Sequence, residues 1–287
     1  MAKKHVIFTT SDEKFEDFVL HHWFKSLKEN VNLANIDVVI IDYGLNEKQK
    51  YNLRLNNVII YKAKKDGRVN NIRFRDIAKY LKKHKYDQVM ATDGGDIIFQ
   101  TDISPLFEKD KDTFRACTEH FNFSFEKFFF KNSFYKKYED IIKKNITTTR
   151  MINIGMLIGP SEKFRKMSEE CYSMIKDKNK FGPEQIGFNY LLYRDGVKIL
   201  DEGYNFVLET AKKGFFIRNG VFYFRNKKKI SVVHNAGGKN LFRAIKNFGY
   251  GPEYNKLKIS SYIFMRGFFI IARFFYLLKK KLFVKSS

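Results

Sequence analysis

The chain has 287 residues, of which 44% are hydrophobic, so it is long enough to bury one full core with a small appendage. Its two cysteines, Cys117 and Cys171, stand in no metal-ligand spacing, which argues against a disulfide scaffold or a thiolate zinc site and favours a reducing compartment. The formal net charge of +23 predicts attraction to polyanions, a class that includes nucleic acid, anionic lipid and phosphorylated substrates.

The first part of the chain alternates short β-rich runs with helical patterns, an order that predicts a parallel sheet built from βαβ units. The predicted elements are a strand at Val6–Thr10, a helix at Phe15–Leu27, a strand at Asp37–Asp42, a helix at Glu47–Leu55, a strand at Asn57–Tyr61, a helix at Asn71–Lys83 and a strand that ends at Asp93. The first apolar run is too short for a signal peptide, so we expect no secretion. Ligands of such sheets bind beyond the carboxyl ends of strands, which predicts a shared edge for Thr9–Asp12 and Asp93–Asp96.

The middle of the chain, Phe121–Lys144, is crowded with Phe, Tyr and Lys and has no clear periodicity, so we expect a lid or an acceptor-side insertion there. Regular patterns return with a buried strand in INIGMLIGP, a helix from Ser161 to about Lys176, a short helix that begins at Pro183, and a strand in ISVVHNAGG. No internal repeat or low-complexity linker interrupts them, which favours one catalytic domain over residues 1–250.

The remaining segment, 251–287, has a different character, most clearly over Ile259–Lys285. Its longest apolar runs hold six and five residues, at Gly267–Ala272 and Phe274–Leu278, far below the roughly 20 that span a bilayer. Cations recur every seven residues on one helical face, at Arg266, Arg273 and Lys280. We interpret the segment as an amphipathic helix that lies in the headgroup region of an anionic membrane. The alternatives are a core-packing terminal helix and, less favoured, a nucleic-acid-binding face.

The most informative stretch is VMATDGGDIIFQTDISPLF, in which a strand leads two carboxylates, Asp93 and Asp96, into a turn formed by Gly94 and Gly95. Carboxylates at the end of a strand can hold a divalent ion against phosphate oxygens. The same four residues are also an ordinary turn signal, and on their own the two interpretations have equal weight.

From Val6 to Lys239 the sequence resembles the retaining family 8 glycosyltransferases of the GT-A fold, which include glycogenin and bacterial lipooligosaccharide galactosyltransferases. In that family a strand runs into an Asp-x-Asp motif followed by apolar residues and D-I-S-P-L-F, and DIIFQTDISPLF matches this tail. Asp96 stands at the second motif aspartate. Gly94 replaces the first, and Asp93 lies one residue earlier, so a metal-independent site is the alternative. The resemblance implies a Rossmann-like α/β fold with a mostly parallel sheet flanked by helices.

Further family motifs follow in order along the chain. The VIFTTSDEKF stretch resembles the nucleotide-contacting loop, which implies that Thr9, Thr10 and Ser11 lie near the base; a helix cap is the competing explanation. The NNIRFRDIAKYL stretch resembles the helix whose arginine, here Arg73, reaches the donor. Without the resemblance, a solvated helical arginine would be the simpler interpretation.

The strand INIGMLIGP resembles the one that holds the transferred sugar, which implies this role for Asn153 and places Gly155 where a side chain would clash. The family's next motif is an acidic residue followed by glutamine at a helix start, and Glu184 and Gln185 match it. The resemblance implies that Asn153, Glu184 and Gln185 are the catalytic residues. Helix capping by Glu184 and an ordinary buried asparagine are the structural alternatives.

The VVHNAGGKN stretch completes the set. It resembles the family's metal-binding histidine at the end of a late strand, here His234, and the glycine and lysine that hold the pyrophosphate, here Gly237 and Lys239. The lysine lies five residues after the histidine rather than the family's six. Asp93, Asp96 and His234 are therefore the expected metal ligands, with Mn²⁺ preferred over Mg²⁺ because imidazole suits transition ions.

Together these matches imply transfer of a hexose, from UDP-glucose or UDP-galactose, to a cell-envelope glycan or glycolipid with retention of anomeric configuration. We expect a cytoplasmic enzyme bound peripherally to the inner face of the membrane, with no nucleic-acid partner. The alternatives are an inverting or other-donor enzyme of the same fold, a basic nucleic-acid-binding protein, which lacks any recognised module here, and an inactive membrane-attached scaffold.

Overall fold

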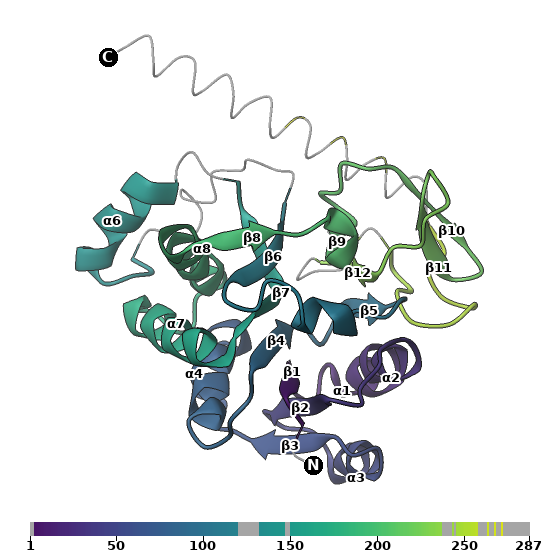
Figure 1. The fold of residues 1–287 in the computed structure, drawn as a ribbon, viewed down its shortest axis with the longest axis horizontal. Helices are drawn as coiled ribbons and strands as arrows, with labels where there is room; N and C mark the ends of the chain where they lie inside the picture. Colours follow the sequence, from purple (N-terminus) through teal and green to yellow (C-terminus); the bar gives the residue numbers. More distant parts are fainter. Residues whose placement is uncertain are drawn as a thin grey trace.

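The computed structural model describes residues 3–119, 132–146, 150–236, 243, 245–257, 263, 267 and 271. Its centre is a seven-stranded sheet in the order β3-β2-β1-β4-β7-β6-β8 (Figure 1). The strands are β1 His5–Ser11, β2 Ile36–Asp42, β3 Ile59–Lys62, β4 Gln88–Thr92, β6 Phe114–Thr118, β7 Ile152–Pro160 and β8 Val197–Ile199. The pairs among β1, β2, β3 and β4 are parallel, as is β6 with β8, whereas β7 runs antiparallel to both β4 and β6. The prediction of a mostly parallel sheet is confirmed.

Helices cover both faces of this sheet (Figure 1). They are α1 Glu16–Phe18, a π-helical turn η1 Val19–Phe24, α2 Lys25–Asn30, α3 Glu47–Leu55, α4 Val69–Leu81, α6 Lys136–Ile146, α7 Ser161–Met174 and α8 Pro183–Asp195, with 3₁₀ turns η2 Ser104–Phe107 and η3 Glu202–Tyr204. Alternate strand residues point to opposite faces. In β1, Val6 and Phe8 join the core beneath α4, α7 and α8, while Ile7 joins the core beneath η1, α2 and α3.

A smaller sheet extends the molecule beyond the end of β4. Strand β12 Val232–His234 pairs antiparallel with β5 Ile97–Phe99 and parallel with β9 Phe206–Val207. A separate hairpin joins β10 Phe215–Arg218 to β11 Val221–Phe224. A third core cluster lies between these strands and contains Phe206, Phe222 and Phe248.

Three predicted elements need correction. The helix predicted at Phe15–Leu27 is interrupted by η1 and continues to Asn30. The helix that begins at Pro183 is 13 residues long rather than short. The stretch predicted to lack periodicity contains α6 in its described part, while its role as a lid or an acceptor-side insertion stays a prediction. Tyr138 and Ile142 of α6 lie one helical turn apart and pack on the main core, a periodicity that the surrounding Lys and Phe residues obscured. Residues 120–131 of that stretch lie outside the described residues.

The C-terminal segment lies mostly outside the described residues, so its predicted amphipathic helix stays a prediction. Residues 251–257, which the sequence analysis placed in this segment, lie beside the β10–β11 turn: Asn255 Nδ2 donates to the Gly220 carbonyl at 2.8 Å. Across the part of the chain that the structure describes, no helix has both the length and the hydrophobicity that a bilayer crossing requires.

Candidate active site

A cavity of about 480 Å³ lies where β1 and β4 end and runs along β7. Its lining includes most of the residues predicted from sequence: Thr10, Ser11, Arg73, Asp93, Gly94, Gly95, Asp96, Asn153, Gly155, Glu184, Gln185 and His234. Thr9 lies behind the wall, where its hydroxyl donates to the Thr92 carbonyl at 3.1 Å. Gly237 and Lys239 lie outside the described residues.

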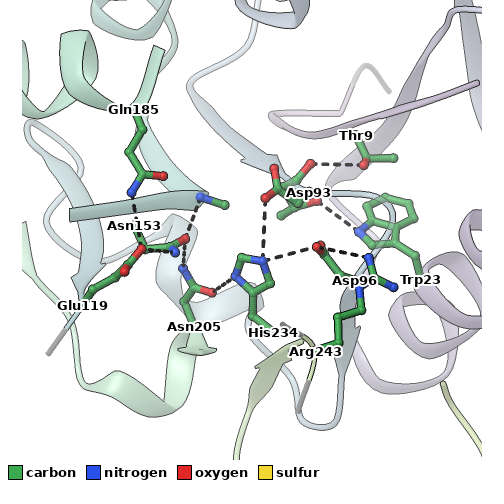
Figure 2. Close-up of polar contacts among 12 residues, drawn as sticks. Thr9, Trp23, Asp93, Asp96, Glu119, Asn153, Gln185, Asn205, His234 and Arg243 are labelled. Carbon is green, nitrogen blue, oxygen red and sulfur yellow. Dashed lines mark hydrogen bonds and ion pairs between the residues drawn. The ribbon is translucent and has the colours of Figure 1, made fainter. Parts of the chain in front are cut away.

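Asp93, Asp96 and His234 form a compact cluster at one end of the cavity (Figure 2). Each offers one ligating atom, and these atoms all lie within 4.8 Å of one another. His234 Nε2 is 3.7 Å from Asp93 Oδ2 and 3.5 Å from Asp96 Oδ1. Asp96 Oδ1 is buried and accepts no hydrogen bond, an arrangement that a cation would satisfy. Two carboxylates and an imidazole also match the donor set of a Mn²⁺-type ion, so the residues fit a divalent metal.

The backbone fixes the three members of this cluster. The Asp93 N–H donates to the Gly155 carbonyl at 2.8 Å, and the Asn235 N–H donates to the Asp96 carbonyl at 2.9 Å. His234 sits opposite Ile97 in the β12–β5 pair. The end of β4 is held further by Trp23, whose indole N–H donates to the Thr92 hydroxyl at 3.1 Å. The carboxylates therefore come from the β4–β5 turn and the imidazole from a strand that pairs with it.

Charge in the cluster is arranged in opposing pairs. Burial alone would raise the pKa of Asp93, but the Arg73 guanidinium, which donates to its carboxylate, and His234 outweigh burial and lower that pKa. Burial alone would lower the pKa of His234, but the carboxylates of Asp96 and Asp93 raise it to about 9. A proton on His234 thus supplies the positive charge that a bound cation would supply between the same carboxylates.

Gly155 leaves room for the cluster, and Gly94 leaves room for the end of β1. A Cβ atom on Gly155 would lie 2.5 Å from His234 Cε1 and 2.9 Å from Asp93 Oδ2. A Cβ atom on Gly94 would lie 2.6 Å from both the Thr10 carbonyl oxygen and Thr9 Oγ1. The position of the missing motif aspartate is therefore filled by the end of β1, and the carboxylate beside His234 comes from Asp93.

A chain of amides and one carboxylate leads away from His234 along the cavity (Figure 2). His234 Nδ1 lies 3.0 Å from Asn205 Oδ1, and Asn205 Nδ2 donates to Asn153 Oδ1 at 3.0 Å. Asn153 Nδ2 donates to Glu119 Oε1 at 2.7 Å, and Gln185 Nε2 donates to the same oxygen at 3.3 Å. The candidate metal-binding cluster and the residues predicted to hold the sugar are thus connected in one network of polar contacts.

Two members of this network, Glu119 and Asn205, are not predicted from the sequence. Each is a single buried polar residue beside a short strand and belongs to no motif, so nothing in the sequence singles it out. Arg243, which lines the cavity and places Nη2 3.8 Å from Asp96 Oδ2, is not predicted from the sequence either. The cation predicted directly after the Gly-Gly pair is Lys239, which lies outside the described residues and stays a prediction.

Glu184 and Gln185 sit at the start of α8, where Gly182 has φ 94° and Pro183 opens the helix. The Glu184 side chain is buried. Burial raises its pKa, and the nearby Arg73 only partly opposes this. Arg73 thus interacts electrostatically both with Glu184 at the start of α8 and with Asp93 at the end of β4.

No protein-family model matches the chain, and no curated protein matches it significantly in sequence. Solved structures do match its fold. An active-site mutant of LgtC has a TM-score of 0.56 and 17% identity, and the complex of galactosyltransferase LgtC with donor and acceptor sugar analogues has a TM-score of 0.54 and 16% identity. Each match covers 91% of this chain and 95% of the other.

The apo structure of the bifunctional glycosyltransferase WbbM matches with a TM-score of 0.56 and 14% identity, over 84% of this chain and 47% of that longer one. At these identities the matches establish a common architecture. The expected fold is confirmed: the chain has the GT-A fold that LgtC has, over about nine-tenths of its length.

Proposed function

We propose that the protein is a retaining glycosyltransferase that moves a hexose from a nucleotide diphosphate sugar, UDP-glucose or UDP-galactose, to a glycan or glycolipid acceptor. The observation that carries this proposal is the cluster of Asp93, Asp96 and His234 at the end of a cavity whose wall also presents the amides of Asn153 and Gln185. The cluster could hold a metal ion against the diphosphate, and the two amides could form hydrogen bonds with the hydroxyl groups of the sugar ring.

In this proposal Asp93, Asp96 and His234 hold Mn²⁺, which when bound supplies positive charge next to the departing diphosphate. Arg243 approaches the Asp96 carboxylate and adds a second positive charge at this end of the cavity. Thr10 and Ser11 lie at the edge where the base would bind. The carboxylates thereby lie next to the leaving group, away from the anomeric carbon.

Asn153 and Gln185 face the sugar position in this proposal, both anchored on Glu119. The bond between the anomeric carbon and the diphosphate oxygen breaks, and the acceptor oxygen bonds to the same face of the sugar. The proton of the acceptor hydroxyl goes to the departing phosphate oxygen. No side-chain base is required for this balance.

We also propose that the enzyme works at the inner face of the cell membrane, with residues 251–287 as the membrane-associating segment. The absence of acidic residues after Glu253 supports this placement, because anionic lipid headgroups repel carboxylates. A glycolipid acceptor would be met at that surface.

A panel of nucleotide sugars, each with Mn²⁺, with Mg²⁺ and with EDTA, tests the donor assignment. One UDP-sugar with Mn²⁺ should raise the melting temperature on the order of 5 °C at about 100 times its Kd, and the same pair should show slow hydrolysis. A response that survives EDTA would contradict the metal assignment. No response to any donor, or a product of inverted configuration by NMR, would contradict the proposed function.

An Asn205→Ala variant should weaken Mn²⁺ binding by about 10- to 100-fold, the usual effect of removing a residue that orients a metal ligand. The Asn205 amide contacts both His234 Nδ1 and Asn153 Oδ1. With a proton on Nδ1 donated to Asn205, the Nε2 lone pair is left to face the metal position. Titration with Mn²⁺, followed by electron paramagnetic resonance, measures the affinity directly.

Two further variants sharpen the Asn205 result. Asn205→Asp keeps an acceptor for His234 but loses the donor to Asn153, so it should retain more Mn²⁺ affinity than Asn205→Ala. Asn52→Ala on α3, outside the cavity, should leave the affinity unchanged. Equal Mn²⁺ affinity in Asn205→Ala and Asn52→Ala would show that Asn205 does not orient the histidine.

A further inference from the structure

The β10–β11 hairpin has an inner and an outer face with different chemistry. Asn219 and Gly220 join its strands with φ of 48° and 74°, the left-handed values that a two-residue hairpin turn requires. On the inner face, Phe222 and Phe224 are buried in the third core cluster. The register places Phe216 opposite Tyr223, one residue out of phase with the inner set, so both rings lie on the outer face.

The outer face combines aromatic surface with positive charge. The rings of Phe216 and Tyr223 stack with centroids 5.3 Å apart and 16° between planes, and Phe216 is 39% exposed. Arg218 follows Phe216 on the same face. The exposed cations in and around the hairpin are Lys212, Lys213, Arg218, Arg225, Lys227, Lys228 and Lys229. Residues 212–229 contain no Asp or Glu; Lys213 pairs with Asp201 and Glu202 from outside this stretch.

The last continuous stretch of described residues packs beside this hairpin. Asn255 Nδ2 donates to the Gly220 carbonyl, and a Cβ atom on Gly220 would lie 2.0 Å from the Gly251 carbonyl oxygen. Leu257, the last residue of the continuous described stretch, packs on the third core cluster with the inner hairpin residues. Residues 258–287, which are rich in Phe, Lys and Arg and contain no acidic residue, therefore follow directly from the hairpin's surroundings.

We propose that the outer face of the β10–β11 hairpin, with its surrounding lysines and arginines, docks on an anionic lipid bilayer. Aromatic side chains prefer the boundary between headgroups and acyl chains, and cations next to them contact lipid phosphates. Phe216 and Tyr223 stack on each other, which leaves the pair suited to shallow insertion rather than to accepting separate nucleic-acid bases. The residues of this surface are distinct from those of the tail.

Docking through the hairpin also orients the cavity. Val207, Glu209 and Thr210 line the cavity, and Thr210 is followed after one residue by Lys212, the first cation of the docking surface. The edge of the cavity therefore lies beside the membrane-facing surface. In terms of the proposed function, on which this step alone rests, a glycolipid acceptor would reach the cavity without leaving the bilayer.

The full-length double variant Phe216→Ser/Arg218→Gln tests the surface against a matched control, Lys48→Gln/Tyr51→Ser. The control removes one exposed aromatic ring and one exposed cation from α3, so net charge and ring count change equally. Co-sedimentation with phosphatidylcholine vesicles containing phosphatidylglycerol should show about tenfold weaker binding for the hairpin variant than for the control. Neutral phosphatidylcholine vesicles should bind both weakly.

A tryptophan reports contact directly. In a Phe216→Trp variant, brominated lipids should quench the fluorescence of the new indole if the hairpin contacts the bilayer. The native Trp23 is fully buried and supplies a constant background. Equal vesicle binding by the hairpin and control variants, or an unquenched Trp at position 216, would overturn the proposal. Hairpin-dependent binding of an RNA oligonucleotide without hairpin-dependent vesicle binding would overturn it too. Donor hydrolysis in solution should be unchanged in the hairpin variant. If the parent, the hairpin variant and the control variant all fail to hydrolyse a donor, that result would contradict the proposed function and not the docking surface.

Discussion

A His234→Ala variant is expected to lose Mn²⁺ binding and to fall by about 1,000-fold or more in kcat/KM for donor hydrolysis. His234 is 2% exposed and lies between Asp93 and Asp96, so its removal deletes one of three candidate ligands. It also leaves two carboxylates facing each other without the imidazole between them. Metal titration and steady-state hydrolysis of the UDP-sugar that the nucleotide-sugar panel selects measure both effects.

Controls separate this effect from misfolding. His84→Ala, which removes an exposed histidine from the loop that follows α4, should keep full activity. Asp96→Asn preserves the shape of the side chain and should lose metal affinity while its circular dichroism and melting temperature stay near those of the parent. Normal Mn²⁺ affinity in both His234→Ala and Asp96→Asn would refute the metal site.

A Gly155→Ala variant is expected to be the second most damaging change, with activity reduced by about 100-fold or more. The added methyl group would lie 2.5 Å from His234 Cε1, so either the imidazole or the middle of β7 must shift. Overpacking of this kind also destabilises the fold by about 1–3 kcal/mol. Hydrolysis rates at a temperature well below both melting transitions report the activity loss.

The matched control lies on the same strand. A Cβ atom on Gly159 would lie 2.5 Å from the Phe114 ring, in the main core and away from the cavity. Gly159→Ala should therefore lower the free energy of unfolding by a similar amount while leaving Mn²⁺ affinity and hydrolysis intact. Equal activity losses in the two variants would mean that Gly155 matters for packing alone.

The local pattern of the sequence predicts the first half of the fold well. The helix predicted at Glu47–Leu55 has those bounds in the structure, because Asn46 Oδ1 caps it by accepting the Gln49 N–H at 2.8 Å. Strand β7 is also found, but its antiparallel direction is not, since an apolar run carries no sign of direction. Strands β5, β8 and β9 hold two or three residues each, too few for a periodicity to emerge.

The candidate site likewise contains residues that the sequence predicts and residues that only the structure reveals. The residues that cluster near the ends of strands or in recognisable motifs, such as Asp96 and His234, are found from sequence. Glu119 and Asn205 reach the site only through the order of the strands: β6 lies beside β7, and β9 beside β12. That order depends on long-range pairing, so neither residue could be placed near Asn153 before the structure was known.

The pairing of β12 has a consequence for the order in which the protein matures. All seven strands of the central sheet are complete once residue 199 has been made, whereas His234 arrives with the later three-stranded sheet. Chains fold from the N-terminus during synthesis, so a ribosome-bound intermediate can hold the whole sheet and both aspartates while the third candidate ligand has not yet left the ribosome. Tight Mn²⁺ binding would then mark the last assembly step, and newly made chains would stay inactive until that step is finished.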